Sequence, residues 1–249
     1  HAPQTLVRHA PQVLAHHAPQ VLAAGERASL DFVHLPYEYY TDADIAHRVI
    51  YVESTRGCPF RCEFCLSSLS GRVRFFPEEP FFAAMERLLA RGARRFKFID
   101  RTFNVSDTHA LTLLDFFAAR WQPGMQLHFE IVPDRISASL LERFLTFPPG
   151  GLHLEAGIQT FNPAVLALIS RTQDKERALT NLRRLIDTGR AEVHADLIMG
   201  LPGQTSEDIA NDFRQLFALG PHEIQVGVLK RLRGTPILRH TEPYQLNFS

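Results

Sequence analysis

The sequence contains little cysteine and no long apolar segment. Its three cysteines all lie between Cys58 and Cys65, and such an odd, clustered set cannot form a disulfide framework. No uninterrupted apolar run approaches the roughly 20 residues that a membrane-spanning helix requires, and the first residues lack the charged and then apolar layout of a signal peptide. We therefore expect a cytoplasmic protein that does not cross a membrane.

A net charge is also lacking, because 27 basic residues balance 27 acidic residues among the 249. No broad electrostatic field would attract nucleic acid or an anionic membrane, so we expect neither as a partner. In contrast, hydrophobic residues make up 45% of the chain. This is enough to bury a substantial core, and an α/β barrel of this length is commonly a single domain.

The first part of the chain is unlike the rest. Residues 1–24 contain the sequence HAPQ three times, starting at His1, His9 and His17. Proline interrupts a long helix, and the spacing is shorter than the roughly 20 residues of a useful structural repeat. We expect residues 1–35 to be an arm or interdomain linker and 36–249 to be the folded domain. Since the chain starts with His1 rather than Met, we expect a fragment of a longer protein.

From residue 48 onward, short β-rich runs alternate with amphipathic helical runs, which is typical of repeated βα units and a parallel sheet. Five helical stretches separate the six expected strands. The strands are expected at 48–54, 95–100, 126–132, 152–158, 192–198 and 222–229. Six strands are too few for a closed eight-stranded barrel, so we expect an α/β fold, a three-quarter TIM-like (β/α)6 barrel. Its functional site should lie at the carboxyl ends of the strands.

The three cysteines follow the first expected strand with the spacing C-x-x-x-C-x-x-C. A structural zinc site normally has four protein ligands, and the chain contains no fourth cysteine. On a cubane iron–sulfur cluster, three cysteines leave one iron without a protein ligand, which a reactive cluster requires. We expect Cys58, Cys62 and Cys65 to be metal ligands. A zinc knuckle and three unreactive buried thiols are the alternatives.

The segment CPFRCEFC, with an aromatic residue directly before its last cysteine, resembles the motif of the radical S-adenosylmethionine (SAM) superfamily. This resemblance implies that Cys58, Cys62 and Cys65 hold a [4Fe–4S] cluster, that SAM chelates its open iron, and that Phe64 lies against the adenine. By the same resemblance, reduction cleaves SAM to methionine and a 5′-deoxyadenosyl radical, which abstracts hydrogen from a substrate. A reductase or a flavodoxin- or ferredoxin-type protein would supply the electron.

Polar residues near the ends of the later strands resemble the SAM-binding residues of the coproporphyrinogen dehydrogenase and cobalamin-associated branches of this superfamily. The resemblance implies that Glu130 meets the methionine amino group or the ribose. Gln159 and Asp196 would meet the ribose or nearby polar atoms, and Arg171 the SAM carboxylate, which suits a two-pronged guanidinium. Asp100 takes the place of an amino-group-binding stretch but departs from its Gly-Gly-Glu form. Salt bridges at a barrel rim are the alternative for the acids, and a helix C-cap for Arg171.

Residues of about 36 to 240 resemble cobalamin-binding-domain radical SAM proteins of uncharacterised substrate, in stretches such as GIQTFN and HADLIMGLPG. No D-x-H-x-x-G cobalamin signature is present and 1–35 is too short for a cobalamin domain, so any cobalamin would bind through sequence outside this chain. Cobalamin-dependent methyl transfer and direct radical oxidation or rearrangement, on a small-molecule or unknown substrate, both stay open. A non-catalytic iron–sulfur or zinc scaffold is a third alternative.

Three strand histidines each lie two residues before an acid, so each pair shares one face of its strand. The pairs are His128 and Glu130, His153 and Glu155, and His194 and Asp196. These histidines could line a substrate cavity, donate protons or ligate a second metal, or they could be hydrogen-bonded core groups, and the sequence leaves these interpretations open.

Overall fold

The structure, a computed structural model, describes residues 29–248, so the HAPQ repeats lie outside the described residues. The chain divides into two units, 1–33 and 34–249. The short 3-10 helix η1 (Leu30–Phe32) belongs to the first unit, and all other described elements belong to the second. Over 29–248, no helix has both the length and the apolar character that a bilayer crossing requires.

Six parallel strands form the main sheet, in the order β1-β4-β5-β6-β7-β8. Strands β1 and β8 stand at the two ends of this order. The strands are β1 (Ile50–Val52), β4 (Arg95–Phe98), β5 (Gln126–Ile131), β6 (Leu152–Gln159), β7 (Ala191–Met199) and β8 (Glu223–Val228). The six predicted strands are thus all present, and the predicted α/β partial barrel is confirmed.

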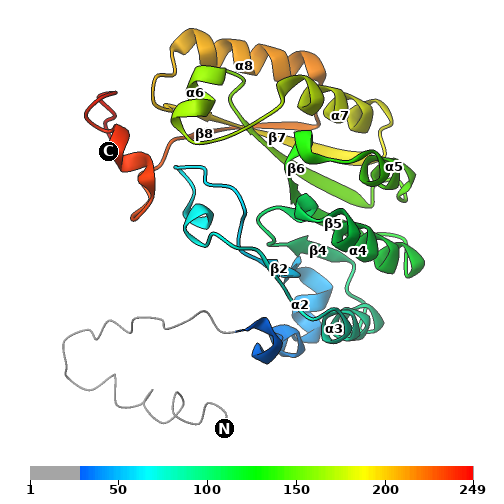
Figure 1. The fold of residues 1–249 in the computed structure, drawn as a ribbon. Coiled ribbons are helices and arrows are strands. Elements are labelled where there is room, and N and C mark those ends of the chain that lie inside the picture. The colour runs from blue at the N-terminus through cyan, green and yellow to red at the C-terminus, as the bar shows by residue number, and fades with distance from the viewer. Residues whose placement is uncertain (1–28, 249) are drawn as a thin grey trace, which may run out of the picture. The chain divides into compact units, whose positions relative to one another are not determined.

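Helices connect the consecutive strands of this sheet. They are α3 (Glu78–Ala90), α4 (Asp107–Ala119), α5 (Ala138–Thr146), α6 (Pro163–Leu168), α7 (Lys175–Asp187) and α8 (Ser206–Leu219). Figure 1 shows α3, α4, α5, α7 and α8 on one side of the curved sheet and the cyan segment after β2 on the other side. This arrangement leaves one face of the sheet free of these helices.

Several short elements were not predicted from the sequence. The strands β2 (Thr55–Arg56) and β3 (Arg74–Phe75) form a two-stranded antiparallel pair. Residues 57–73 between them carry the three cysteines and are called the cysteine segment below. The remaining short elements are η2 (Pro36–Tyr39), α2 (Asp42–His47), η3 (Leu66–Leu69), η4 (Phe103–Val105), η5 (Pro133–Arg135) and η6 (Pro236–His240).

Side-chain caps fix where the longer helices begin. Ser106 and Ser137 accept backbone N–H groups three residues on, at the starts of α4 and α5. Thr205 forms a capping box with Asp208 at the start of α8, which satisfies two backbone donors at once. Gly220 ends α8 in the left-handed conformation that glycine adopts without a steric penalty. The polar and glycine residues of the sequence therefore set the helix boundaries.

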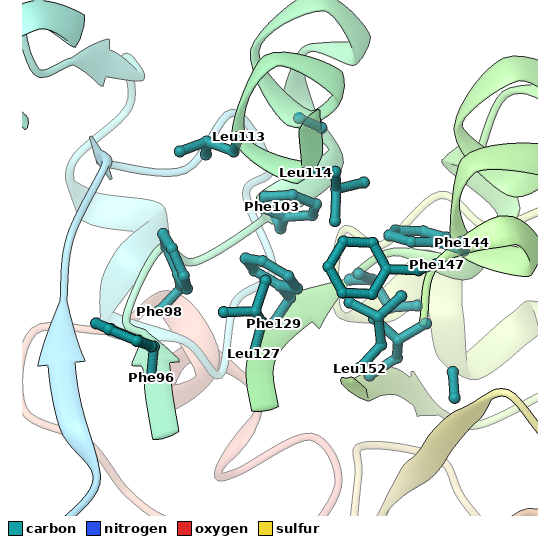
Figure 2. Close-up of a cluster of buried hydrophobic side chains, with 14 of the residues drawn as sticks. Phe96, Phe98, Phe103, Leu113, Leu114, Leu127, Phe129, Phe144, Phe147 and Leu152 are labelled. Carbon is teal, nitrogen blue, oxygen red and sulfur yellow. The ribbon is translucent and has the colours of Figure 1, made fainter. Parts of the chain in front are cut away.

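The core lies between the sheet and its helices. In β5, Leu127, Phe129 and Ile131 are buried while His128 and Glu130 are half-buried, as the alternation of strand side chains requires. Figure 2 shows the buried side chains as an aromatic cluster in which Phe103 lies against Phe129, with ring centroids 3.7 Å apart. The helix side of the sheet is therefore apolar, and the opposite face carries the polar residues.

Candidate functional site

A cavity lies where the cysteine segment faces the carboxyl ends of the strands. Its empty volume is about 650 Å³, with open solvent at its mouth included. The lining residues predicted from the sequence are Cys58, Cys62, Phe64, Cys65, Glu130, Gln159, Arg171 and Asp196. The structure therefore brings together, from distant parts of the sequence, every predicted site residue except Asp100.

The backbone of the cysteine segment is held by glycine and by local hydrogen bonds. Gly57 has a φ of +107°, and a Cβ atom there would lie 2.4 Å from the carbonyl oxygen of Arg72, so a larger residue would not fit. The N–H of Cys58 donates to Ser70 Oγ at 3.2 Å. The N–H of Cys65 donates to the carbonyl oxygen of Cys62 at 3.0 Å. These contacts fold the segment so that all three cysteines line the cavity.

The three thiols fit an iron–sulfur cubane better than a single metal ion. All three cysteines are free, and no group of three or more His, Cys, Asp or Glu residues within 29–248 is arranged to hold one metal ion. In a cubane each thiolate binds a different iron, so the sulfurs need not converge on one point. A structural zinc ion requires four ligands around one centre, which the described residues do not supply.

Polar groups already contact two of the sulfurs. The Sγ of Cys58 lies 3.7 Å from Thr102 Oγ1, and Arg171 Nη1 donates to Cys62 Sγ at 3.6 Å. Burial raises the pKa of the Cys58 thiol. Because metal ligation requires the thiolate, iron binding has to displace this proton. The arginine beside Cys62 favours negative charge at this end of the cavity.

A bulge in β6 places Gln159 in the cavity, close to Arg171 of the α6–α7 connection. The register between β6 and β7 shifts between Gly157 and Gln159, and Gln159 has a φ of +70°. A Cβ atom at Gly157 would lie 2.7 Å from Gln159 Nε2 and 3.9 Å from Arg171 Nη2. Arg171 Nη2 also donates to the carbonyl oxygen of Gly157. The missing side chain at Gly157 therefore makes room for the amide of Gln159, whereas Arg171 would lie at ordinary van der Waals distance from a Cβ atom there.

Three carboxyl groups line the cavity with different proton affinities. Glu155 accepts from His128 Nε2 at 2.8 Å and from Lys97 Nζ at 3.3 Å. The hydrogen bond from His128, and then the positive charge of Lys97, lowers the pKa of Glu155 to about 2. Burial, and then the charge of Glu155, raises the pKa of Glu130 to about 7 and that of Asp196 to about 6. The cavity thus holds one fixed negative charge and two carboxyls that titrate near neutral pH.

The three strand histidines lie on the same face of the sheet as these acids, toward the amino ends of the strands. The rings of His128 and His153 stack with centroids 4.2 Å apart. His194 Nε2 lies 3.2 Å from Asp196 Oδ1. None of the three lines the cavity itself. They are therefore neighbours of the cavity acids on the polar face, not members of the apolar core.

Asp100 is the predicted site residue that the structure does not bring to the cavity. Its side chain is 1% exposed. Its carboxylate accepts from the N–H and Oγ of Ser54, at 3.0 and 2.6 Å, and from Thr55 Oγ1 at 2.6 Å. The physical reason is strand alternation, because Asp100 shares the parity of the buried Phe96 and Phe98. Asp100 instead joins the end of β4 to Ser54 and Thr55, the residues that lead from β1 into the cysteine segment.

Some cavity residues were missed by the sequence reasoning. They include Phe60, Ser68, Arg101, Thr102 and Gly157. Arg101 Nη1 lies 3.9 Å from Glu130 Oε1. The same alternation that turns Asp100 away from the cavity places its neighbour Arg101 on the cavity side. Arg101 could therefore have been predicted by extending the alternation of β4 beyond Phe98.

Comparison with known proteins gives the family. The model of the Radical SAM superfamily matches residues 52–216. A ribosomal protein uS12 methylthiotransferase, RimO of Trichlorobacter lovleyi, is 30% identical over 173 residues, which are 65% of this chain and 38% of that protein. An oxygen-independent coproporphyrinogen III oxidase of Salmonella typhimurium is 32% identical over 101 residues, 41% of this chain and 22% of that protein. The chain spans less than half the length of these curated relatives.

Two solved structures share the fold. The radical SAM methyltransferase TsrM of Kitasatospora setae, solved with cobalamin and a [4Fe-4S] cluster bound, superposes with a TM-score of 0.67 at 19% identity, over 76% of this chain and 38% of that one. The coproporphyrinogen III oxidase HemN of Escherichia coli gives 0.59 at 21% identity, over 77% and 46%. Since the family model covers more than half of the chain, and the cysteine motif predicted the same assignment, this chain belongs to the Radical SAM superfamily of enzymes.

Proposed function

We propose that residues 36–249 form a catalytic radical SAM barrel, with 1–35 as an arm or linker. In it, Cys58, Cys62 and Cys65 hold a [4Fe–4S] cluster beside a SAM site. One observation carries the proposal: three free cysteines and polar side chains from β5, β6, β7 and the α6–α7 connection line one cavity. Membership of the superfamily implies the same two cofactors. When bound and reduced, the cluster supplies the electron that cleaves SAM to methionine and a 5′-deoxyadenosyl radical.

The roles of the other cavity residues follow from their chemistry. We propose that Arg171 binds the SAM carboxylate, since its guanidinium can engage both oxygens and already lies beside Cys62. Glu130 would bind the amino group in its ionised form, because a carboxylate attracts an ammonium. Gln159 and Asp196 would hold the ribose or neighbouring polar atoms, and Phe64 the adenine. Asp100 is left out of this set and acts through the backbone of the cysteine segment.

The reaction type is a separate proposal. Cobalamin-dependent methyl transfer is compatible with the fold, which resembles a methyltransferase with cobalamin bound, and direct radical oxidation or rearrangement is the alternative. We propose that any cobalamin is held by sequence outside this chain, and that a reductase or a flavodoxin- or ferredoxin-type protein is the electron donor. Addition of hydroxocobalamin to the protein, followed by visible absorbance, tests the first point, and an unchanged cobalamin spectrum is the result expected for this chain alone.

The main experiment is anaerobic reconstitution with iron and sulfide, followed by dithionite and SAM. The expected result is a [4Fe–4S] absorbance and EPR signature together with 5′-deoxyadenosine. Cys62→Ala should lose the intact cluster signature, whereas Arg171→Ala should keep the signature and lose SAM binding. Glu142→Gln, an exposed change on α5, is the control that should alter neither. Tight zinc binding with no SAM cleavage would instead support the scaffold alternative.

A further inference from the structure

Glu63 lies between two cysteines of the motif, yet it does not line the cavity. Its side chain is 3% exposed and forms an ion pair with Arg239. Its Oε1 accepts a hydrogen bond from Ser170 Oγ at 2.6 Å, and its Oε2 lies 3.0 Å from His240 Nε2. A buried carboxylate costs free energy unless it is paired and hydrogen-bonded, and Glu63 meets both conditions with residues more than 100 positions away.

The backbone of Glu63 makes two further long-range contacts. Its N–H donates to the carbonyl oxygen of Ile169 at 3.0 Å, and its own carbonyl oxygen accepts from the N–H of Ile237 at 3.1 Å. Ile169 is the C-cap of α6, and Ile237 lies in η6. The cysteine segment is thus fastened at this one residue to two segments that are distant in the sequence.

The contact with Ser170 leads directly to the cavity. Ser170 has a φ of +53°, a conformation that a residue with a Cβ atom adopts at a cost. The next residue, Arg171, directs its guanidinium to Cys62 Sγ at 3.6 Å. Two pairs of sequence neighbours, Cys62–Glu63 and Ser170–Arg171, are therefore joined by two hydrogen bonds. One links Glu63 to Ser170 and the other links Arg171 to Cys62.

We propose that Glu63 is a positioning residue that fixes the distance between the cluster-binding segment and the arginine of the SAM site. Charge-assisted hydrogen bonds are shorter and stronger than neutral ones, so a buried carboxylate that pairs with Arg239 is suited to hold this turn. The η6 segment, through Arg239 and His240, fixes the carboxylate from the other side. This inference rests on the proposed function, since it concerns how the proposed cluster segment and SAM site are aligned.

Two variants test it in the reconstituted protein. Glu63→Gln keeps the shape but removes the negative charge, so the ion pair with Arg239 is lost and the hydrogen bond from Ser170 becomes a weaker, neutral one. Ser170→Gly removes the hydroxyl and tolerates the positive φ, so it is the milder change if Glu63→Gln folds poorly. Glu142→Gln is the control. The readouts are iron content, the Kd for SAM, and the change that SAM causes in the EPR spectrum of the reduced cluster.

We expect Glu63→Gln to retain the cluster, to weaken SAM binding by roughly 5- to 50-fold, which is within the range typical of coupling between sites, and to alter the EPR response to SAM. Ser170→Gly should weaken SAM binding by roughly 2- to 10-fold, the effect of one hydrogen bond. Because both variants act on the same contact, the double variant should weaken SAM binding by clearly less than the product of the two single effects.

Unchanged SAM affinity and EPR response in Glu63→Gln would overturn the inference. Fully additive effects of the two variants would also overturn it, since the contact would then not be the link. Failure of the proposed function is a different result, in which the unaltered protein itself binds no cluster or no SAM. A general loss of structure is identified by lower iron content and earlier thermal unfolding.

Discussion

The raised pKa of Glu130 predicts that one substitution there has opposite effects on SAM binding and on the stability of the folded protein. Burial and the nearby charge of Glu155 raise the pKa of Glu130 from its ordinary value of 4.5 to about 7. In the folded protein the carboxyl therefore keeps its proton between about pH 4.5 and 7, whereas in the unfolded chain it is ionised there. Since the folded state binds more protons in this window, this residue lowers stability as the pH rises through it.

The magnitude follows from the two pKa values. With about 1.4 kcal/mol for each tenfold change in an equilibrium constant, ionised Glu130 destabilises the folded protein by about 2 to 3 kcal/mol at pH 8, after allowance for its partial exposure. Glu130→Gln removes this cost. The variant should exceed the unaltered apoprotein in stability by about 2 to 3 kcal/mol at pH 8, and the difference should shrink to nearly zero at pH 4.

Urea unfolding of both apoproteins between pH 4 and 8, followed by circular dichroism, measures this difference. The charge of Glu155 is present in both proteins, so its own contribution to the pH dependence largely cancels. Binding of SAM should change in the opposite direction, with Glu130→Gln weakening it by roughly tenfold or more through loss of a charge-assisted contact. Two stability curves that run parallel from pH 4 to 8 would refute the reasoning, because Glu130 would then not titrate with a raised pKa.

Three further substitutions test individual parts of the structure. Asp100→Asn should destabilise the protein by about 1 to 3 kcal/mol in urea unfolding, because buried partners lose an acceptor, but should leave the Kd for SAM within about twofold if Asp100 acts only on the backbone. Gly157→Ala should weaken SAM binding by roughly tenfold or more in calorimetry, because its Cβ would lie 2.7 Å from Gln159 Nε2. Gly227→Ala is the control and should have little effect on SAM binding, because the nearest atom to its Cβ would be 3.7 Å away. Equal effects of the two variants would contradict the packing argument. Phe129→Ala should cost about 3 to 5 kcal/mol of unfolding free energy, and a loss below about 1 kcal/mol would contradict its place in the core.

Most of the fold could be predicted from local patterns in the sequence. Alternating burial in β5 and β6 and the helical stripes between the strands arise from interactions close in the chain, so the six strands and the helices between them could be predicted. The pair β2 and β3 was missed because each strand has two residues. Such short strands carry no periodicity, and their pairing depends on how the cysteine segment folds back.

Part of the site could likewise be predicted from the sequence, and part could not. Spacing alone identified Cys58, Cys62 and Cys65 as the proposed cluster ligands, because all three lie within a single segment. Glu130, Gln159, Arg171 and Asp196 were named by resemblance. Parallel strands bring Glu130, Gln159 and Asp196 to one edge of the sheet, whereas Arg171 comes from the α6–α7 connection. Alternation within β4, applied to Asp100, would have shown that this carboxylate faces the helix side and that its neighbour faces the cavity.

The sequence by itself determined the element order, the sheet type and the cysteine motif, because these depend on residue type and on short spacings. Only the tertiary structure decided the proton affinities of Glu130 and Glu155, which come from different strands and depend on burial and on the charges of their neighbours. Only the tertiary structure placed Glu63 beside Ser170 and His240, contacts that span 107 and 177 positions of the chain. No local pattern encodes such contacts, because they exist only once the chain has folded and segments far apart in the sequence lie side by side.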